Sequence, residues 1–347
     1  MTIQGPLDIV DNRNLSAVSF PIARTVRNRR YPCTLRQQGL TLEATVARLS
    51  RVTRGDYEGD RRPARARLGS NGDQGVDVTF YNDAVRNSSA TAYDERLVPW
   101  YFQHWANRMV ELADLEPSGQ IVDLACGSGM ITRALLPSLG PAGTIAGIDL
   151  NPGMLAHAQS TIDDARVSWH EADASSLPLD DASVDVLCCH QGLQFFPDRG
   201  AAIDEVHRIL RPGGRIVVAV WGHLDGNPEV VAMSHAIGEF LGDDLGRAMT
   251  GPCGFPVPEE LQQLLGDHGF VDTRVESVSE IARHPDVRDA MDGQFDALPI
   301  SGSIEALGPA RRTELLDRIC EVLEPYVDEN DALAIPATNN FAVGTKP

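Results

Sequence analysis

Between residues 120 and 220, short apolar segments alternate with segments of helical length. The apolar segments are five or six residues long and rich in Val, Ile and Leu, which is typical of strands buried on both faces. These predicted strands cover residues 120–124, 144–149, 167–171, 184–189 and 215–220. Successive strand–helix–strand units pair in parallel through right-handed crossovers, which place helices on both faces of one sheet. We therefore predict an α/β fold with a doubly wound, Rossmann-like and mostly parallel sheet.

The sequence on either side of this core predicts further helices and two more strands. In residues 93–115, apolar side chains recur at three- and four-residue steps, and Pro99 is early enough for the first turn of a second helical piece. After Trp221 the pattern loosens, as in a helical insertion that forms a substrate wall. Helices are predicted there at residues 258–268, 285–295 and 309–323. An extended segment at 270–277 and a closing strand at 333–343 would complete a seven-stranded sheet.

The turn after the first predicted strand, residues 125–129, has the sequence ACGSG. Small residues at a strand-to-helix turn let a ligand approach the backbone N–H groups at the helix N-terminus. A dinucleotide fingerprint would carry its third glycine at position 132, which is Thr132. Asp123, just before the turn, would also repel a pyrophosphate. Both features disfavour NAD as the ligand.

Two aspartates follow the second and third predicted strands. Asp149 stands twenty residues beyond Gly129, where a carboxylate can accept hydrogen bonds from both ribose hydroxyls of an adenosyl ligand. The alternative is that Asp149 caps the helix that begins at Pro152. Asp173 could accept a hydrogen bond from an adenine amino group, or it could be a loop or capping residue.

Four segments occur in an order and spacing that are jointly specific. They read DLACGSG at 123–129, GIDLNPGML at 147–155, EADA at 171–174 and LRPGG at 210–214. Together they resemble the class I S-adenosylmethionine-dependent methyltransferases, in the ubiquinone/menaquinone-biosynthesis C-methyltransferase-like (type 11) branch. The resemblance covers about residue 81 to the C-terminus. It implies S-adenosyl-L-methionine as the cofactor and a small or medium-sized organic molecule as the methyl acceptor, with O, N or C as the accepting atom.

The resemblance also assigns roles to individual residues around the methionine and ribose of the cofactor. Gly127 and Gly129 would pass under the methionine moiety, and Asp123 would contact its amino group directly or through water. Asp149 would hold the ribose. In relatives, the segment before the core folds over the cofactor as a lid, and Tyr93 is the best candidate there for touching the ligand.

At the adenine end, the resemblance implies that Met154 packs on the ring and that Asp173 with Ala174 reads its edge. The complete set of predicted cofactor-binding residues is Tyr93, Asp123, Ala125, Gly127, Gly129, Asp149, Leu150, Met154, Asp173, Ala174 and His190. No metal is predicted, because the sequence has no C-x-x-C pair and no H-E-x-x-H motif.

No catalytic residue is assigned from the sequence, and two histidines are candidates. A sulfonium already makes its methyl group electrophilic, so the protein's task is alignment and the exclusion of water. His190, at the end of the fourth strand, could line the cofactor, act as a general base, or simply be a strand-end histidine with a satisfied hydrogen bond. His104 is a second candidate base. Two other functions stay open: an NAD(P)-dependent oxidoreductase on the same fold, and a non-catalytic protein that binds an adenosyl ligand.

Charge divides the chain into two parts. The net charge is −19, but residues 1–75 hold 13 Arg against 7 acidic residues, whereas the remainder holds 17 basic against 42 acidic residues. We interpret residues 1–75 as a basic, poorly ordered extension. Residues 76–347 would be the methyltransferase domain, and its strong negative charge argues against nucleic acid as a partner.

Within that domain we expect a helical lid at 76–116, a cofactor-binding core at 117–222, and a substrate wall with closing strands at 223–347. The sequence has no apolar run of about 18 residues and no leader with a basic start and an apolar stretch, so we expect a cytoplasmic protein without a membrane span. The six cysteines fit reduced, buried thiols, and nothing in the sequence indicates an oligomeric state.

Overall fold

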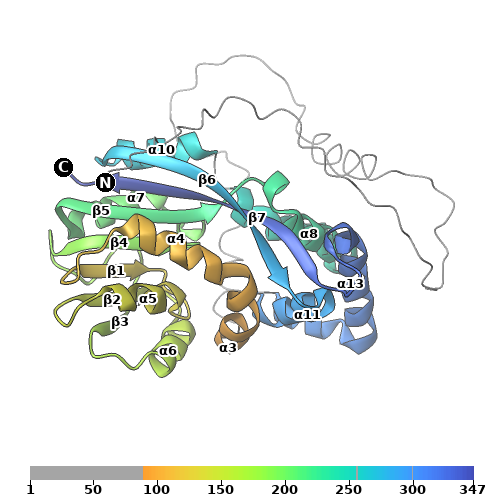
Figure 1. Cartoon of the computed structure of the whole chain (residues 1–347). Helices are drawn as coiled ribbons and strands as arrows, with labels where there is room; N and C mark the ends of the chain where they lie inside the picture. Colours follow the sequence, from red (N-terminus) through yellow and green to blue (C-terminus); the bar gives the residue numbers. More distant parts are fainter. Residues whose placement is uncertain (1–88, 255–256, 299) are drawn as a thin grey trace, which may run out of the picture. The chain divides into compact units, whose positions relative to one another are not determined.

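The structure is a computed structural model that describes residues 89–254, 257–298 and 300–347. The predicted basic extension and the boundary between residues 75 and 76 lie outside the described residues. Inside them, one seven-stranded sheet has the strand order β3-β2-β1-β4-β5-β7-β6 (Figure 1). The strands are β1 Gln120–Leu124, β2 Thr144–Asp149, β3 Val167–Glu171, β4 Val184–His190, β5 Leu210–Trp221, β6 Val271–His284 and β7 Leu333–Thr345.

The first five strands pair in parallel, and β7 runs antiparallel to both β5 and β6. This confirms the predicted doubly wound, mostly parallel sheet of seven strands. The chain enters at β1, extends to β2 and β3 on one side, and then returns to β4 on the other side. Loops at the carboxyl ends of β1 and β4 therefore diverge, which opens a crevice at the point where the strand order reverses.

Helices cover both faces of the sheet because its strands are apolar on both sides. In β4, Val186 and Cys188 belong to one core cluster, and Leu187 and Cys189 belong to the other. This alternation follows the two-residue period of a strand. The helices that cover the sheet are α4 Gln103–Ala113, α5 Met130–Leu135, α6 Pro152–Thr161, α7 Arg199–Ile209 and α10 Pro258–Asp267.

The N-terminal helical segment, residues 90–113, consists of α3 Ala90–Ala92, the π-helix η1 Tyr93–Phe102 and α4. The side chain of Ser89 accepts a hydrogen bond from the N–H of Ala92 and so caps its start. Pro99 lies inside the π-helix, not in the first turn of a second piece as predicted. A proline has no N–H to donate and its ring collides with the carbonyl four residues earlier in an α-helix, so the wider π-helix accommodates it.

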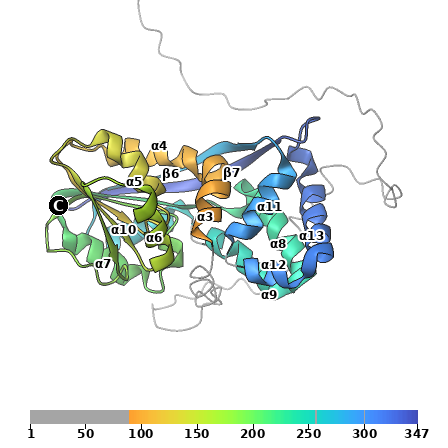
Figure 2. The same ribbon diagram turned by 90° about the horizontal axis from the view of Figure 1, so that it is seen from below.

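A second group of helices gathers at the far end of the sheet, as Figure 2 shows. They are α8 Pro228–Leu241, α9 Asp243–Thr250, α11 Val287–Ala297, α12 Ser301–Ala306 and α13 Gly308–Leu323. The predicted helices near 285–295 and 309–323 are confirmed by α11 and α13, whereas α8 and α9 were not predicted. Helix α8 is buried at Val230, Met233 and Ile237 as well as at its alanines, so its sequence shows no clear polar face.

The antiparallel ribbon of β6 and β7 connects this helical end to the rest of the sheet. Its pairing runs from Val271 opposite Thr345 to His284 opposite Leu333. Helix α11 follows β6 directly, and the short helix η6 Glu324–Tyr326 leads from α13 into β7. The sheet therefore carries both the turn after β1 and the helical end. No helix within the described ranges is long and apolar enough to cross a membrane.

Candidate functional site

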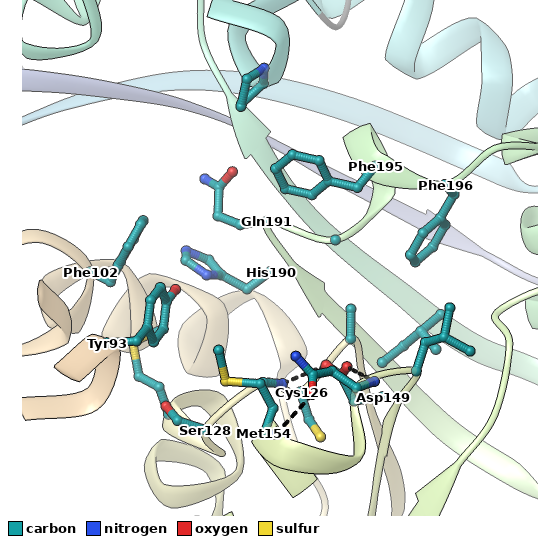
Figure 3. A pocket seen from close by; sticks show the side chains of 18 of the residues that line it. Tyr93, Phe102, Cys126, Ser128, Asp149, Met154, His190, Gln191, Phe195 and Phe196 are labelled. Carbon is teal, nitrogen blue, oxygen red and sulfur yellow. Dashed lines mark hydrogen bonds between the residues drawn. The ribbon is translucent and has the colours of Figure 1, made fainter. Parts of the chain in front are cut away.

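A cavity of about 400 Å³ lies at the carboxyl ends of β1, β2, β4 and β5. Its lining includes the turn after β1, the N-terminal helical segment, and parts of α8 and α11. Figure 3 shows side chains from these different elements pointing into the same space, among them Tyr93, Phe102, His190 and Met154. The cavity therefore occupies the crevice that the reversal of strand order creates.

The two glycines of the turn after β1 have different roles. Gly127 has φ +52° and lines the cavity, and a Cβ added to it would meet nothing within 4 Å. Gly129 has φ +82° but does not line the cavity, and its Cβ would lie 2.7 Å from Cδ1 of Ile162 and 3.1 Å from the ring of Trp169. Packing behind the turn therefore requires Gly129, and only Gly127 leaves room for a ligand.

Asp123 does not line the cavity either, because it is fully buried beneath the turn. Its Oδ2 accepts hydrogen bonds from the N–H of Thr132 (2.8 Å) and from the Thr132 hydroxyl (2.7 Å). Burial raises the pKa of Asp123 to about 7, against the effect of these hydrogen bonds. The threonine that replaces the third glycine of a dinucleotide fingerprint thus ties the end of β1 to the first turn of α5.

Asp149 lies at the edge of the cavity with both carboxylate oxygens oriented by the backbone. Oδ2 accepts from the N–H of Gly127 (2.8 Å), and Oδ1 accepts from the N–H of Asn151 (2.8 Å). Burial raises the pKa of Asp149, while these N–H groups favour its charged form. The cap of α6 is Asn151, whose Oδ1 accepts from the N–H groups of Gly153 and Met154. The carboxylate of Asp149 retains acceptor capacity for a further donor.

The predicted adenine-binding residues meet along one side of the cavity. Leu150, Met154, Asp173 and Ala174 all line it, together with Ala125 from the turn after β1. Met154 is buried, whereas Leu150 is 41% exposed and leaves an apolar surface for a ligand to cover. Asp173 also has the predicted loop role. Its Oδ1 accepts from the N–H and the hydroxyl of Ser175, which lower its pKa.

Of the two candidate bases, only His190 lines the cavity. It is 8% exposed, its ring meets that of Phe102 edge-on at 5.9 Å, and its Nε2 has no hydrogen-bond partner among the described residues. Burial, with the nearby His104, lowers the pKa of His190 to about 3, so the ring is neutral and weakly basic at pH 7. His104 packs on Trp105 instead, with ring centroids 4.3 Å apart.

An interaction that sequence reasoning missed joins the N-terminal helical segment to the turn after β1. Asp94 accepts hydrogen bonds from the hydroxyl of Ser128 (2.7 Å) and from the guanidinium of Arg133, and it pairs with Nε2 of His157 at 3.2 Å. The pKa of Asp94 is lowered by these partners, against desolvation. Next to it, Tyr93 stacks on Phe102 with ring centroids 5.7 Å apart.

The cavity extends from this region to a second polar group at the helical end. Glu229, in the first turn of α8, is 1% exposed, and its Oε2 accepts a hydrogen bond from the Tyr101 hydroxyl at 3.0 Å. Glu229 was not among the predicted site residues, because α8 was not predicted. The available signal was local: Asn227, Pro228 and an acidic residue in the next position form a typical helix start.

Comparison with known proteins identifies the core around this cavity. Residues 122–218 match the family model described as a methyltransferase domain. The chain is 29% identical over 185 residues to the demethylmenaquinone methyltransferase of Staphylococcus aureus. The matched region covers 50% of this chain and 76% of that relative. This chain is a class I S-adenosylmethionine-dependent methyltransferase. S-adenosylmethionine is its methyl donor, and the oxidoreductase alternative is set aside.

A solved structure from Haemonchus contortus has the same fold. Phosphoethanolamine N-methyltransferase 2 of Haemonchus contortus, in complex with S-adenosyl-L-methionine, has a TM-score of 0.50 and 18% sequence identity to this methyltransferase. The match covers 78% of this chain and 59% of that one. It shows the fold shared by the two enzymes.

Proposed function

We propose that this methyltransferase binds S-adenosylmethionine between the turn after β1 and the loops after β2 and β3, with the acceptor in the remainder of the cavity. Three residues support the donor position. Gly127 leaves open space beside its backbone, Asp149 presents oriented oxygens, and Leu150 exposes an apolar surface at the expected adenine position. In this proposal Asp149 accepts hydrogen bonds from the ribose hydroxyls.

The acidic side chains that line the cavity support a cationic methyl donor. They are Asp149, Asp173, Asp198 and Glu229. No Lys or Arg is found among the described lining residues. A positively charged sulfonium is therefore favoured in this cavity, whereas an anionic acceptor would be repelled. An uncharged, largely apolar acceptor of small or medium size fits best.

When bound, the sulfonium supplies an electrophilic methyl group. The chain's own residues then have to align the acceptor for in-line displacement and keep water out. Tyr93, Leu97 and Phe102 of the N-terminal helical segment cover one side of the cavity, and Trp221 at the end of β5 meets Phe102 with ring centroids 5.9 Å apart. Such walls exclude water and hold the reacting atoms near contact distance. We assign no proton transfer to His190, since its neutral ring is a weak base.

One observation carries the proposal: a single cavity joins Asp149 at one end to the apolar walls of α8 and α11 at the other. The test is calorimetric titration of the full chain with S-adenosylhomocysteine, followed by a screen of uncharged and anionic organic acceptors for release of S-adenosylhomocysteine from S-adenosylmethionine. We expect binding in the micromolar range and turnover with uncharged acceptors. Absence of binding, or turnover confined to anionic acceptors, would contradict the proposal.

A further inference from the structure

The acceptor end of the cavity contains a buried carboxyl group that the donor does not need. Glu229 lies on α8 and is 1% exposed, and its Oε2 accepts a hydrogen bond from the hydroxyl of Tyr101. Burial raises the pKa of Glu229 to about 7, and the nearby side chains of Tyr101 and Gln294 oppose that shift. A buried carboxyl group is costly to keep in an apolar wall unless a hydrogen-bonding or charged group pairs with it.

Two oxygen atoms at this end have no hydrogen-bond partner among the described residues. One is Oε1 of Glu229, and the other is Oε1 of Gln294, which comes from α11 and is 5% exposed. Leaving a buried acceptor unpaired costs about 1–3 kcal/mol. Oε1 of Gln294 is an acceptor, and Oε1 of Glu229 is an acceptor while the carboxyl is charged. Both residues line the cavity, so the missing partner is a hydrogen-bond donor that enters the cavity.

The surroundings of the pair restrict the rest of that ligand to apolar chemistry. Val230 and Met233 of α8 line the cavity beside Glu229, and so do Met249 and Pro252 from the segment after it. Methionine side chains adapt to irregular apolar shapes, and they make favourable contacts with aromatic rings. An apolar or aromatic body with one donor group therefore fits this end.

As the group that donates this hydrogen bond, a neutral hydroxyl fits better than an ammonium. Burying two charges together requires the desolvation of both, and the raised pKa of Glu229 shows that this position already disfavours even one charge. The sulfonium of S-adenosylmethionine adds a positive charge to the same cavity, and this charge would repel a second cation. A hydroxyl can donate to either unpaired oxygen without these costs.

We propose that Glu229 and Gln294 bind a hydroxyl group of the methyl acceptor, which is therefore an apolar, hydroxylated molecule such as a phenol. This inference rests on the proposed function, because it takes the donor to occupy the other end of the cavity. Tyr101 has a positioning role here: its hydroxyl holds Oε2 and leaves Oε1 of Glu229 for the ligand.

The test uses two probes that differ only in the donor group, 2-naphthol and 2-methoxynaphthalene. Calorimetry on the full chain saturated with S-adenosylhomocysteine measures the affinity of each. We expect 2-naphthol to bind at least tenfold more tightly in the wild-type protein, in line with a hydrogen bond to a buried acceptor. In Glu229→Leu and in Gln294→Leu we expect the preference to fall below about threefold.

The matched control is Glu239→Gln, a change on the same helix at an exposed residue that pairs with Arg318, and it should leave the preference intact. If Glu229→Leu does not fold, Gln294→Leu decides the question alone. Equal binding of the two probes, no binding of either, or an unchanged preference in the folded variants overturns the inference. Failure of S-adenosylhomocysteine to bind overturns the proposed function itself, and the two failures are distinguished in the same titrations.

Discussion

The hydroxyl of Ser128 in the turn after β1 donates a hydrogen bond of 2.7 Å to the carboxylate of Asp94 in the π-helix. Arg133 and His157 contact the same carboxylate, so Asp94 joins the N-terminal helical segment to the turn and to α6. Tyr93, which lines the cavity, is its neighbour in the chain. The position of the cavity wall formed by the π-helix therefore depends on this carboxylate.

We expect Asp94→Asn to weaken S-adenosylhomocysteine binding about tenfold, because hydrogen bonds to a charged group contribute roughly 1.5–3 kcal/mol and this one positions the cavity wall. Calorimetry measures the affinity, with Glu95→Gln, an exposed neighbour, as the control. An affinity equal to that of the control would mean that the donor site forms without this contact.

Asp149→Ala tests the proposed ribose contact. Loss of the carboxylate removes the acceptor for the N–H of Gly127 as well as any bond to a ligand, so we expect at least a tenfold loss of S-adenosylmethionine affinity. Asp163→Ala, an exposed aspartate after α6, is the matched control. Wild-type affinity in Asp149→Ala would remove the ribose assignment.

Substitution of the two glycines of the turn should have different effects. Gly129→Ala combines a positive φ with overpacking against Ile162, so we expect a loss of about 2–4 kcal/mol in the free energy of unfolding. Gly127→Ala has the φ strain alone, about 1–2 kcal/mol, but its methyl group enters the cavity. Urea unfolding and calorimetry on both variants should show that the first loses more stability and the second loses donor affinity.

The raised pKa of Asp123 predicts how stability varies with pH. In the unfolded chain this carboxyl has a pKa near 3.8, and in the folded protein its pKa is about 7. Between these values the folded state holds a proton that the unfolded state releases, so the contribution of Asp123 to stability falls as pH rises from about 4 to 7. The slope is at most about 1.4 kcal/mol per pH unit.

Asp123→Asn mimics the protonated carboxyl and should remove that slope. Urea unfolding at several pH values measures the effect as a difference between the variant and the wild type. The hydrogen bonds from Thr132 can be retained by the Asn oxygen, so the variant should be folded. Parallel pH profiles for the two proteins would show that Asp123 is charged in the folded state.

The strands and the turn after β1 could be predicted because their signals are local. A buried parallel strand is a continuous apolar run, and residues 125–129 follow such a run directly. The right-handed crossover then gives the face of the sheet on which each connecting helix lies. The capping residue of α6 could not be predicted from local sequence. Asp149 and Asn151 are both good capping residues, and the structure shows that Asn151 caps the helix.

The contacts that shape the two ends of the cavity could not be predicted, because their partners are distant in sequence. Tyr101 and Glu229 are 128 residues apart, and Asp94 and Ser128 are 34 apart. Neither pair leaves a motif in one sequence.

Asp123 shows a different limit, since a buried acid with a local partner and a ligand-binding acid have the same sequence pattern. The predicted contact of Asp123 with the methionine amino group stays a prediction, with the carboxyl beneath the turn and outside the cavity lining.

The two halves of the cavity come from different parts of the chain, and the ribbon of β6 and β7 connects them. Apart from the predicted His190, the residues proposed to hold the methyl donor lie before residue 175, whereas most of the acceptor wall comes from helices inserted between β5 and β7. The long antiparallel pairing fixes those helices to the sheet through backbone hydrogen bonds, which depend little on side-chain identity. Substitutions within the inserted helices can therefore change which molecule is methylated while the binding site of the methyl donor stays the same.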